Sequence, residues 1–172
     1  GQLTFASYGN GSSAHLAGEL FKMMAGVDLL HVPYKGAAPA VNDLLGGQVM
    51  MTMDSQIQAL PYIRDGRLRA LGVLGKSRSA QLPDVPSISE VLPGYDLTNW
   101  FGLVAPAATP KDILSKISVD VAKALENPEL REKITALSAT VVGDTPEQFG
   151  ATIRADSEKW ARVIHEAGIK AE

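Results

Sequence analysis

The sequence predicts an α/β fold built on a mostly parallel sheet with helices on both faces. One observation behind this prediction is a unit of strand, short loop and amphipathic helix that recurs three times between residues 3 and 64. Another is composition, because 45% hydrophobic and 20% charged residues in a chain of 172 are close to globular averages. Disordered, collagen-like and coiled-coil classes are therefore disfavoured.

The first unit begins with a short strand over residues 3–7, which a glycine-containing break at 8–12 ends. Residues 13–25 follow with helical periodicity. The apolar residues that recur at this spacing, and so predict the buried face, are Leu16, Leu20, Met23 and Met24.

The second unit has a continuous apolar run at 27–33, typical of a buried strand, and a loop at 34–38. Pro39 suits the first position of the next helix, and Gly46 suits its end.

The third unit has a strand at 49–53, and Asp54 and Ser55 then cap a helix that runs to about residue 64. After a turn at 65–66, residues 68–74 predict a fourth strand.

The rest of the chain is predicted to leave this sheet. Residues 83–93 are punctuated by proline and look like a connection across a domain boundary, with Ser87 opening one helical turn. The elements expected beyond it are a strand at 100–105, helices at 110–125 and 128–137, a strand at 140–142, and a long helix from Pro146. Two stripes mark the buried faces of these helices: Ile117, Val121 and Leu125, and Phe149, Ile153, Trp160 and Ile164.

Charge and cysteine content narrow the functional classes. A net charge of -3 with scattered Lys and Arg argues against nucleic acid and against a basic membrane-binding face. The absence of cysteine excludes disulfides and thiolate metal sites. No apolar run approaches the roughly 20 residues of a spanning helix. The chain shows no signal peptide and opens at Gly1 almost directly on a strand, as a processed or truncated chain would.

Three loops, at 8–13, 34–38 and 54–56, each follow a strand and precede a helix. In an open α/β sheet such loops converge, and helix starts there present free N–H groups. In the first loop, Gly9 and Gly11 allow close backbone approach. The hydroxyls and N–H groups of Ser12 and Ser13 make a seat for a carboxylate or phosphate.

Each loop also has a plain structural interpretation. Ser12 or Ser13 caps a helix, Asp54 is an N-cap, and Lys35 is a solvated charge. Three such loops at one edge of a sheet favour a binding site over this interpretation.

Two enzyme alternatives stand beside the binding site. Residues 9–14 fit the G-x-G-x-x-A phosphate loop of dinucleotide enzymes. The acidic residue expected after the second strand is replaced by Pro33, Tyr34 and Lys35, although a lysine would suit a phosphorylated ribose. A nucleotide-dependent enzyme therefore stays open as the alternative.

A hydrolase built on Ser12 and His15 is disfavoured, because no G-x-S-x-G elbow and no orienting acid are evident. His15 is expected to line the pocket or to pack, and His31 to be a core histidine. His165 is far in sequence from other ligand types, so no zinc site is expected. We expect no cofactor, no metal and no catalysis.

Several segments together resemble the tripartite tricarboxylate transporter receptors, the Bug or TctC-type family. The matching segments span nearly the whole chain: Leu3–Ser7, Gly9–Glu19, His31–Gly36, Asp54–Ser55, Gly66–Val73, Leu82–Ile88, Pro93–Tyr95 and Trp100–Pro106. The resemblance implies a periplasmic binding protein of type II-like fold, in which two α/β domains close on a small organic acid. Such receptors take di- or tricarboxylates, amino acids or aromatic acids and deliver them to membrane components of a transporter.

The resemblance also implies roles for individual residues. It assigns Gly11, Ser12, Ser13 and His15 to an anion loop, Gly36 and Ala37 to backbone contacts in the second loop, and Asp54 to a group that reads the rest of the ligand.

The sequence departs from the family in one large respect: the family's first half, with its own glycine-rich ligand loop, does not precede Gly1. By resemblance, residues 1–98 are the ligand-binding α/β domain and residues 99–172 are the C-terminal strand–helix part of the other domain. The apolar stripes of that part are then expected to pack on each other, on the first sheet or on a second copy of the chain. Self-association and a half-formed, weak site follow as expectations.

Overall fold

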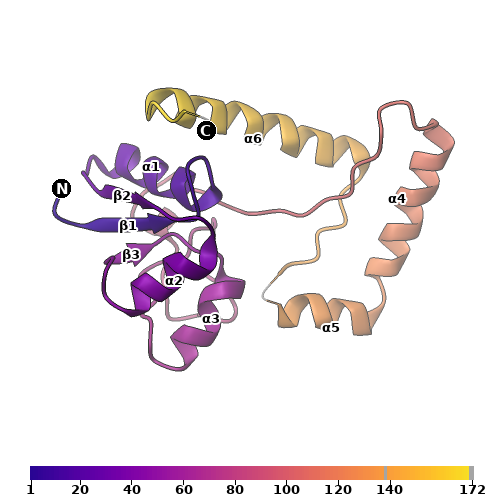
Figure 1. Ribbon diagram of the computed structural model, residues 1–172. Helices are drawn as coiled ribbons and strands as arrows, with labels where there is room; N and C mark the ends of the chain where they lie inside the picture. The colour runs from indigo at the N-terminus through magenta and orange to yellow at the C-terminus, as the bar shows by residue number, and fades with distance from the viewer. Residues whose placement is uncertain (138, 171–172) are drawn as a thin grey trace. The chain divides into compact units, whose positions relative to one another are not determined.

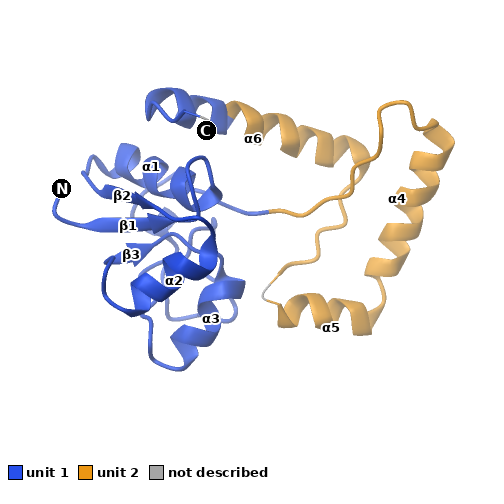
Figure 2. Ribbon diagram, in the orientation of Figure 1, with its two compact units in different colours: residues 1–99, 159–172 blue, residues 100–158 orange. Residues whose placement is uncertain are grey.

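The computed structural model describes residues 1–137 and 139–170 (Figure 1). The chain forms two compact units (Figure 2). Unit 1 comprises Gly1–Asn99 and Lys159–Glu172, and unit 2 comprises Trp100–Glu158. The assignment of 1–98 and 99–172 to two domains of a larger receptor stays a prediction.

Unit 1 is built on a parallel sheet of three strands in the order β2-β1-β3. The strands are β1 (Thr4–Ser7), β2 (Leu30–Pro33) and β3 (Met51–Thr52), and the helices after them are α1 (Ser13–Ala25), α2 (Ala37–Leu45) and α3 (Gln56–Arg64). The predicted α/β class and all three strand–loop–helix units are confirmed. The crossovers from β1 to β2 and from β2 to β3 run in opposite directions. Right-handed connections therefore place α1 and α2 on opposite faces of the sheet (Figure 1).

Helix α1 has the predicted bounds because both of its ends are set locally. At its start the Ser12 hydroxyl accepts a hydrogen bond from the His15 N–H, and at its end Gly26 takes a left-handed conformation, with φ of 64°. Gly18 lets the helix lie close to the sheet, since a Cβ there would fall 2.2 Å from the ring of Phe5. Phe5 is fully buried as a result.

The core of unit 1 has two clusters. Ala6, Ala40 and Val49 join the sheet to α2. Leu20, Tyr95 and Val163 form the second cluster, against which Trp160 also packs. Helix α6 (Pro146–Glu166) thus gives its last residues to unit 1. Within the predicted stripe of this helix, Val163 is buried in place of Ile164, which is 37% exposed.

The fourth strand predicted at 68–74 is wrong, because this segment makes only one isolated bridge, between Val73 and Ser87. A strand needs a continuous partner, and the facing segment has Pro83 and Pro86, which carry no N–H to donate. The turn predicted at Ser87 is confirmed. A capping box formed by Ser87 and Glu90 opens the short 3₁₀ helix η1 (Ile88–Glu90).

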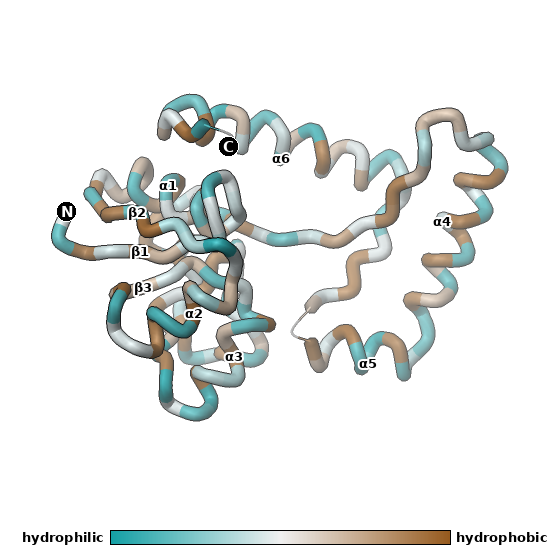
Figure 3. Tube along the Cα trace, viewed as in Figure 1, coloured by the Kyte–Doolittle hydropathy of each residue, from teal (hydrophilic) through white to brown (hydrophobic). Residues whose placement is uncertain are grey.

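Unit 2 contains α4 (Lys111–Leu125), α5 (Pro128–Ala136) and the first part of α6. Asn127 caps α5 through its side-chain oxygen. The strands predicted at 100–105 and 140–142 are wrong, since neither segment pairs with another among the described residues. Apolar and polar residues alternate along α4 (Figure 3). No described residue of unit 2 is buried. Across the described residues of both units, no helix is long and apolar enough to span a bilayer.

Candidate anion site at the edge of the sheet

The carboxyl ends of the three strands meet at one edge of the sheet because the strands are parallel. The loops at 8–12, 34–36 and 53–55 therefore converge, as the sequence predicts. The chain leaves β1 for β2 on one side and returns to β3 on the other, so the crevice where connections diverge lies between β1 and β3. Ligands of open α/β sheets bind in such crevices.

The loop after β1 is held by its own hydrogen bonds. Gly9 and Gly11 have φ of 129° and 75°, conformations that favour glycine. The Ser12 hydroxyl donates to the Gly9 carbonyl at 2.7 Å and also caps α1. Ser13 is exposed at the first position of the helix. The capping interpretation of Ser12 thus holds, and its role toward a ligand stays a prediction.

His15 contacts the same loop from inside α1. Its Nδ1 accepts a hydrogen bond from the Gly11 N–H at 3.1 Å, and its ring stacks on the ring of His31 at 3.8 Å between centroids. His15 is buried, and burial is the main reason that its pKa lies below the ordinary value; Glu19 raises this pKa and Lys22 lowers it. His15 therefore anchors the loop as an acceptor.

A serine–histidine contact that the sequence interpretation missed lies below the loop. Ser7 Oγ is 2.6 Å from His31 Nε2 and also accepts a hydrogen bond from the Gly9 N–H. Burial, with a smaller effect of His15, lowers the pKa of His31 to about 4. Ser7 is fully buried, so a substrate cannot reach its hydroxyl. The pair supports the loop.

The loop after β2 offers backbone donors. Helix α2 begins at Ala37, two residues before the predicted start at Pro39, and Gly36 is its N-cap with φ of 113° and no side-chain capping bond. Pro39 has no N–H, so the amides of Ala37 and Ala38 are the donors of this helix start. Lys35 is exposed, as expected.

The loop after β3 carries the site's carboxylate. Asp54 is partly buried, and burial is the main reason that its pKa lies above the ordinary value. Its Oδ1 accepts a hydrogen bond from the Ser55 N–H, and Ser55, not Asp54, occupies the N-cap position of α3. The predicted role of Asp54 in reading a ligand stays a prediction.

Two buried polar atoms in these loops have no hydrogen-bond partner among the residues that the structure describes: Tyr8 Oη and Gln56 Nε2. Tyr8 follows β1 and Gln56 begins α3 after β3, so both belong to the β1/β3 crevice. Burial, together with nearby Asp54, raises the pKa of the Tyr8 phenol, yet no hydrogen bond of good geometry joins the two. A buried donor without a partner is costly, so both atoms are candidates for ligand contact. Sequence reasoning selected the loops but omitted these two residues.

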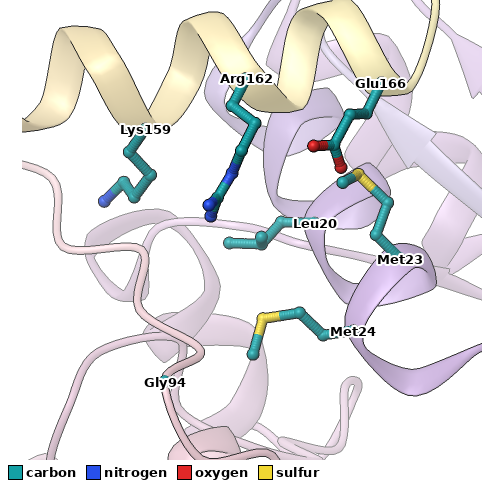
Figure 4. Close-up of a pocket in the computed structure, with 7 residues that line it drawn as sticks. All are labelled: Leu20, Met23, Met24, Gly94, Lys159, Arg162 and Glu166. Atoms are coloured by element: carbon teal, nitrogen blue, oxygen red, sulfur yellow. The ribbon is translucent and has the colours of Figure 1, made fainter.

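A cavity of about 480 Å³ lies elsewhere in unit 1, between α1 and the end of α6 (Figure 4). Its lining residues are Leu20, Met23, Met24, Gly94, Lys159, Arg162 and Glu166. Met23 and Met24 belong to the C-terminal end of α1, whereas the anion loop is at its N-terminal end. This cavity is therefore separate from the sheet edge. Among the described residues, no group of His, Asp and Glu side chains is arranged to hold a metal ion.

Comparison with known families gives one match over almost the whole chain. The family model for the tripartite tricarboxylate transporter family receptor, TctC, matches residues 1–169. A Pseudomonas sp. (strain P51) protein, the UPF0065 protein in the tcbD-tcbE intergenic region, is 39% identical over 99% of this chain and 52% of its own length. The chain thus spans about half the length of this relative. A shorter relative from Pseudomonas knackmussii is 36% identical, and 94% of its length is covered.

Solved structures agree with this match. A structure described as R. palustris Rpa4515 with adipate has a TM-score of 0.85 and 34% identity over 98% of this chain and 56% of its own. The periplasmic binding protein BugD has a TM-score of 0.81 and 33% identity, covering 99% and 58%. MatC from Rhodopseudomonas palustris, with bound malate, has a TM-score of 0.76 and 32% identity, covering 94% and 56%.

Proposed function

This chain belongs to the tripartite tricarboxylate transporter receptor family, and on that basis we propose that it takes part in capturing a small organic carboxylate. The ligand binds in the crevice between β1 and β3 and leaves chemically unchanged. Capture takes place in the periplasm, and the ligand passes to membrane components of the transporter. One observation carries the proposal for this chain: three parallel strands end at one edge in loops that offer backbone and side-chain donors.

The donors of this edge suit a carboxylate. The first turns of α1 and α2 point N–H groups outward at the positive ends of their helices. Tyr8 Oη and Gln56 Nε2 are buried donors without a partner at the same edge. A carboxylate oxygen that accepts from one of them relieves an unsatisfied buried group. Asp54 then faces the part of the ligand away from its carboxylate.

The related structures support an aliphatic diacid as the ligand class. Rpa4515 is described with adipate and MatC with malate, and both resemble this chain over at least 94% of its residues. The two acids share two carboxylates on a short flexible chain. We therefore take adipate and malate as the first compounds to test.

The enzyme alternatives have less support. No acidic residue follows β2 to hold a ribose. The buried Ser7–His31 pair lacks the access that a nucleophile needs. The family and the related structures are solute receptors.

Calorimetric titration with adipate and malate tests the proposal. Separate titrations with NAD and NADP test the nucleotide alternative, and an assay for conversion of each acid tests catalysis. We expect heat from a diacid, a raised unfolding temperature with it, and no conversion. Ser12→Ala should weaken binding because it removes the hydroxyl that fixes Gly9, whereas Ser115→Ala, on an exposed position of α4, should leave it unchanged. Stabilisation by a dinucleotide alone, or a conversion lost with Ser12→Ala, would replace the receptor with an enzyme.

A further inference from the structure

His15 sits where a histidine can decide whether the anion loop has a free donor. Its Nδ1 takes the Gly11 N–H at 3.1 Å, and Gly11 is at the exposed tip of the loop. On the other edge of the ring, Nε2 lies 3.8 Å from Glu19 Oε1. Nδ1 therefore faces a hydrogen-bond donor, and Nε2 faces a carboxylate acceptor.

The hydrogen bond from Gly11 fixes the form of the imidazole. A nitrogen that accepts an N–H carries a lone pair, so the single proton of a neutral ring resides on Nε2, toward Glu19. In this state the Gly11 N–H is committed to His15. The loop then lacks one of the donors that the proposed ligand requires.

Protonation of His15 reverses this arrangement. Nδ1 then carries a proton and points it at the Gly11 N–H, so two donors face each other and neither has an acceptor. Because these two nitrogens are only 3.1 Å apart, their repulsion turns the Gly11 N–H away from the ring. A carboxylate oxygen beside the loop tip then accepts from this N–H and meets the positive charge of His15. Neutral His15 competes with the ligand for the Gly11 N–H, whereas protonated His15 attracts the ligand's carboxylate.

We infer that His15 retains the Gly11 N–H while the loop is empty and releases it by taking up a proton, so that carboxylate capture is coupled to proton uptake at His15. This inference rests on the proposed function, because it concerns how the same site holds its anion. Bulk solvent supplies the proton to His15 when the ligand binds and takes it back when the ligand leaves.

The groups around the ring favour a neutral His15 in the empty site. Burial lowers its pKa most, Glu19 on the same helix raises it, and Lys22, whose Nζ lies 2.9 Å from Glu19 Oε1, lowers it. From β2 the ring meets His31, whose pKa of about 4 keeps it neutral near physiological pH. From β1, Phe5 and Ser7 contact His31 and are uncharged. We therefore expect His15 to be the group in this cluster that takes up a proton when an anion binds nearby.

The sign of the pH dependence follows from linkage. A bound carboxylate raises the pKa of His15, so the affinity is constant above the bound-state pKa and rises as pH falls below it. The gain is about tenfold for each unit by which binding raises that pKa, and it ends below the pKa of the empty site.

Titration of the full chain with adipate from about pH 8 to about pH 5, in two buffers of different ionisation enthalpy, tests the coupling. For the wild type we expect affinity to rise as pH falls, with net proton uptake seen as a buffer-dependent heat. His15→Gln keeps an oxygen that accepts from Gly11 but cannot be protonated, so its affinity should follow only the ionisation of adipate itself. His165→Gln, at an exposed position of α6, should behave as the wild type.

The possible failures are distinct. If adipate and malate bind with the same pH dependence in the wild type and in His15→Gln, the coupling is wrong and the receptor function stands. If neither acid binds at any pH, the proposed function fails and the coupling with it. Nitrogen NMR of the wild type gives a readout that needs no variant: we expect Nδ1 of His15 unprotonated without ligand and protonated with adipate. An Nδ1 that is protonated in both states would overturn the inference.

Discussion

Both units of this chain contain helices with apolar stripes, but the two units differ in whether they bury side chains. Unit 1 fully buries Phe5, Tyr95 and Val163, whereas none of the described residues of unit 2 is buried. On α4 the apolar residues Ile113 and Ile117 are 45% and 43% exposed. Apolar periodicity therefore shows that a helix has a face to cover, but not what covers it. Stability should consequently be concentrated in unit 1.

The largest expected difference comes from removing one aromatic ring in each unit. Phe5→Ala should lower the free energy of unfolding by about 3–5 kcal/mol, because the ring is fully buried between Gly18 and the stack with His31. Phe149→Ala removes a ring that is only partly buried against Trp100 and Gly102, and should cost about 1 kcal/mol or less. Urea unfolding followed by circular dichroism measures both. Equal losses would show that unit 2 is part of the same cooperative core.

A smaller effect of opposite sign in the two units is expected from adding one methyl group to a helix. Gly18→Ala should destabilise the chain by about 1–3 kcal/mol, since the new Cβ would overlap Phe5. Gly150→Ala meets only the end of Arg154 at 3.5 Å, so higher helix propensity should leave stability unchanged or raise it by up to about 1 kcal/mol. Thermal unfolding of the two variants checks the signs. A destabilising Gly150→Ala would mean that α6 is closely packed there.

The smallest effect on stability, within about 0.5 kcal/mol, is expected from a charge in the exposed stripe of α4, such as Ile117→Asp. Its expected effect is on association, because an uncovered apolar stripe favours contact with a second copy. Light scattering should show a concentration-dependent dimer for the wild type and a shift toward monomer for the variant. Lys116→Ala, on the same helix, is the control. A wild type that is monomeric throughout would contradict self-association.

Much of unit 1 could be predicted because its signals are local. Ser12 and Gly26 cap the two ends of α1 and are adjacent to it in sequence. Three strand–loop–helix units in succession specify a parallel sheet. The strand predicted at 68–74 failed because pairing depends on a distant partner, and Pro86 limits that partner to one bridge.

The candidate site divides in the same way. Loops that follow parallel strands must converge, so the edge of the sheet could be predicted. The contacts within it depend on register, which places Phe5 opposite His31 and Ala6 opposite Thr52. Nothing in a single sequence specifies that pairing, so the Ser7–His31 contact and the unpartnered Tyr8 hydroxyl were missed.

The core of unit 1 joins Leu20 and Tyr95 to Val163, and Tyr95 Oη also donates to the Ala17 carbonyl of α1. These residues lie far apart along the chain, so this cluster has a high contact order. During synthesis the strands and α1 leave the ribosome well before Val163 does. The side of α1 that carries Leu20 therefore stays uncovered until the last part of α6 is made. In that interval the growing chain presents Leu20 and Tyr95 to chaperones or to other nascent chains.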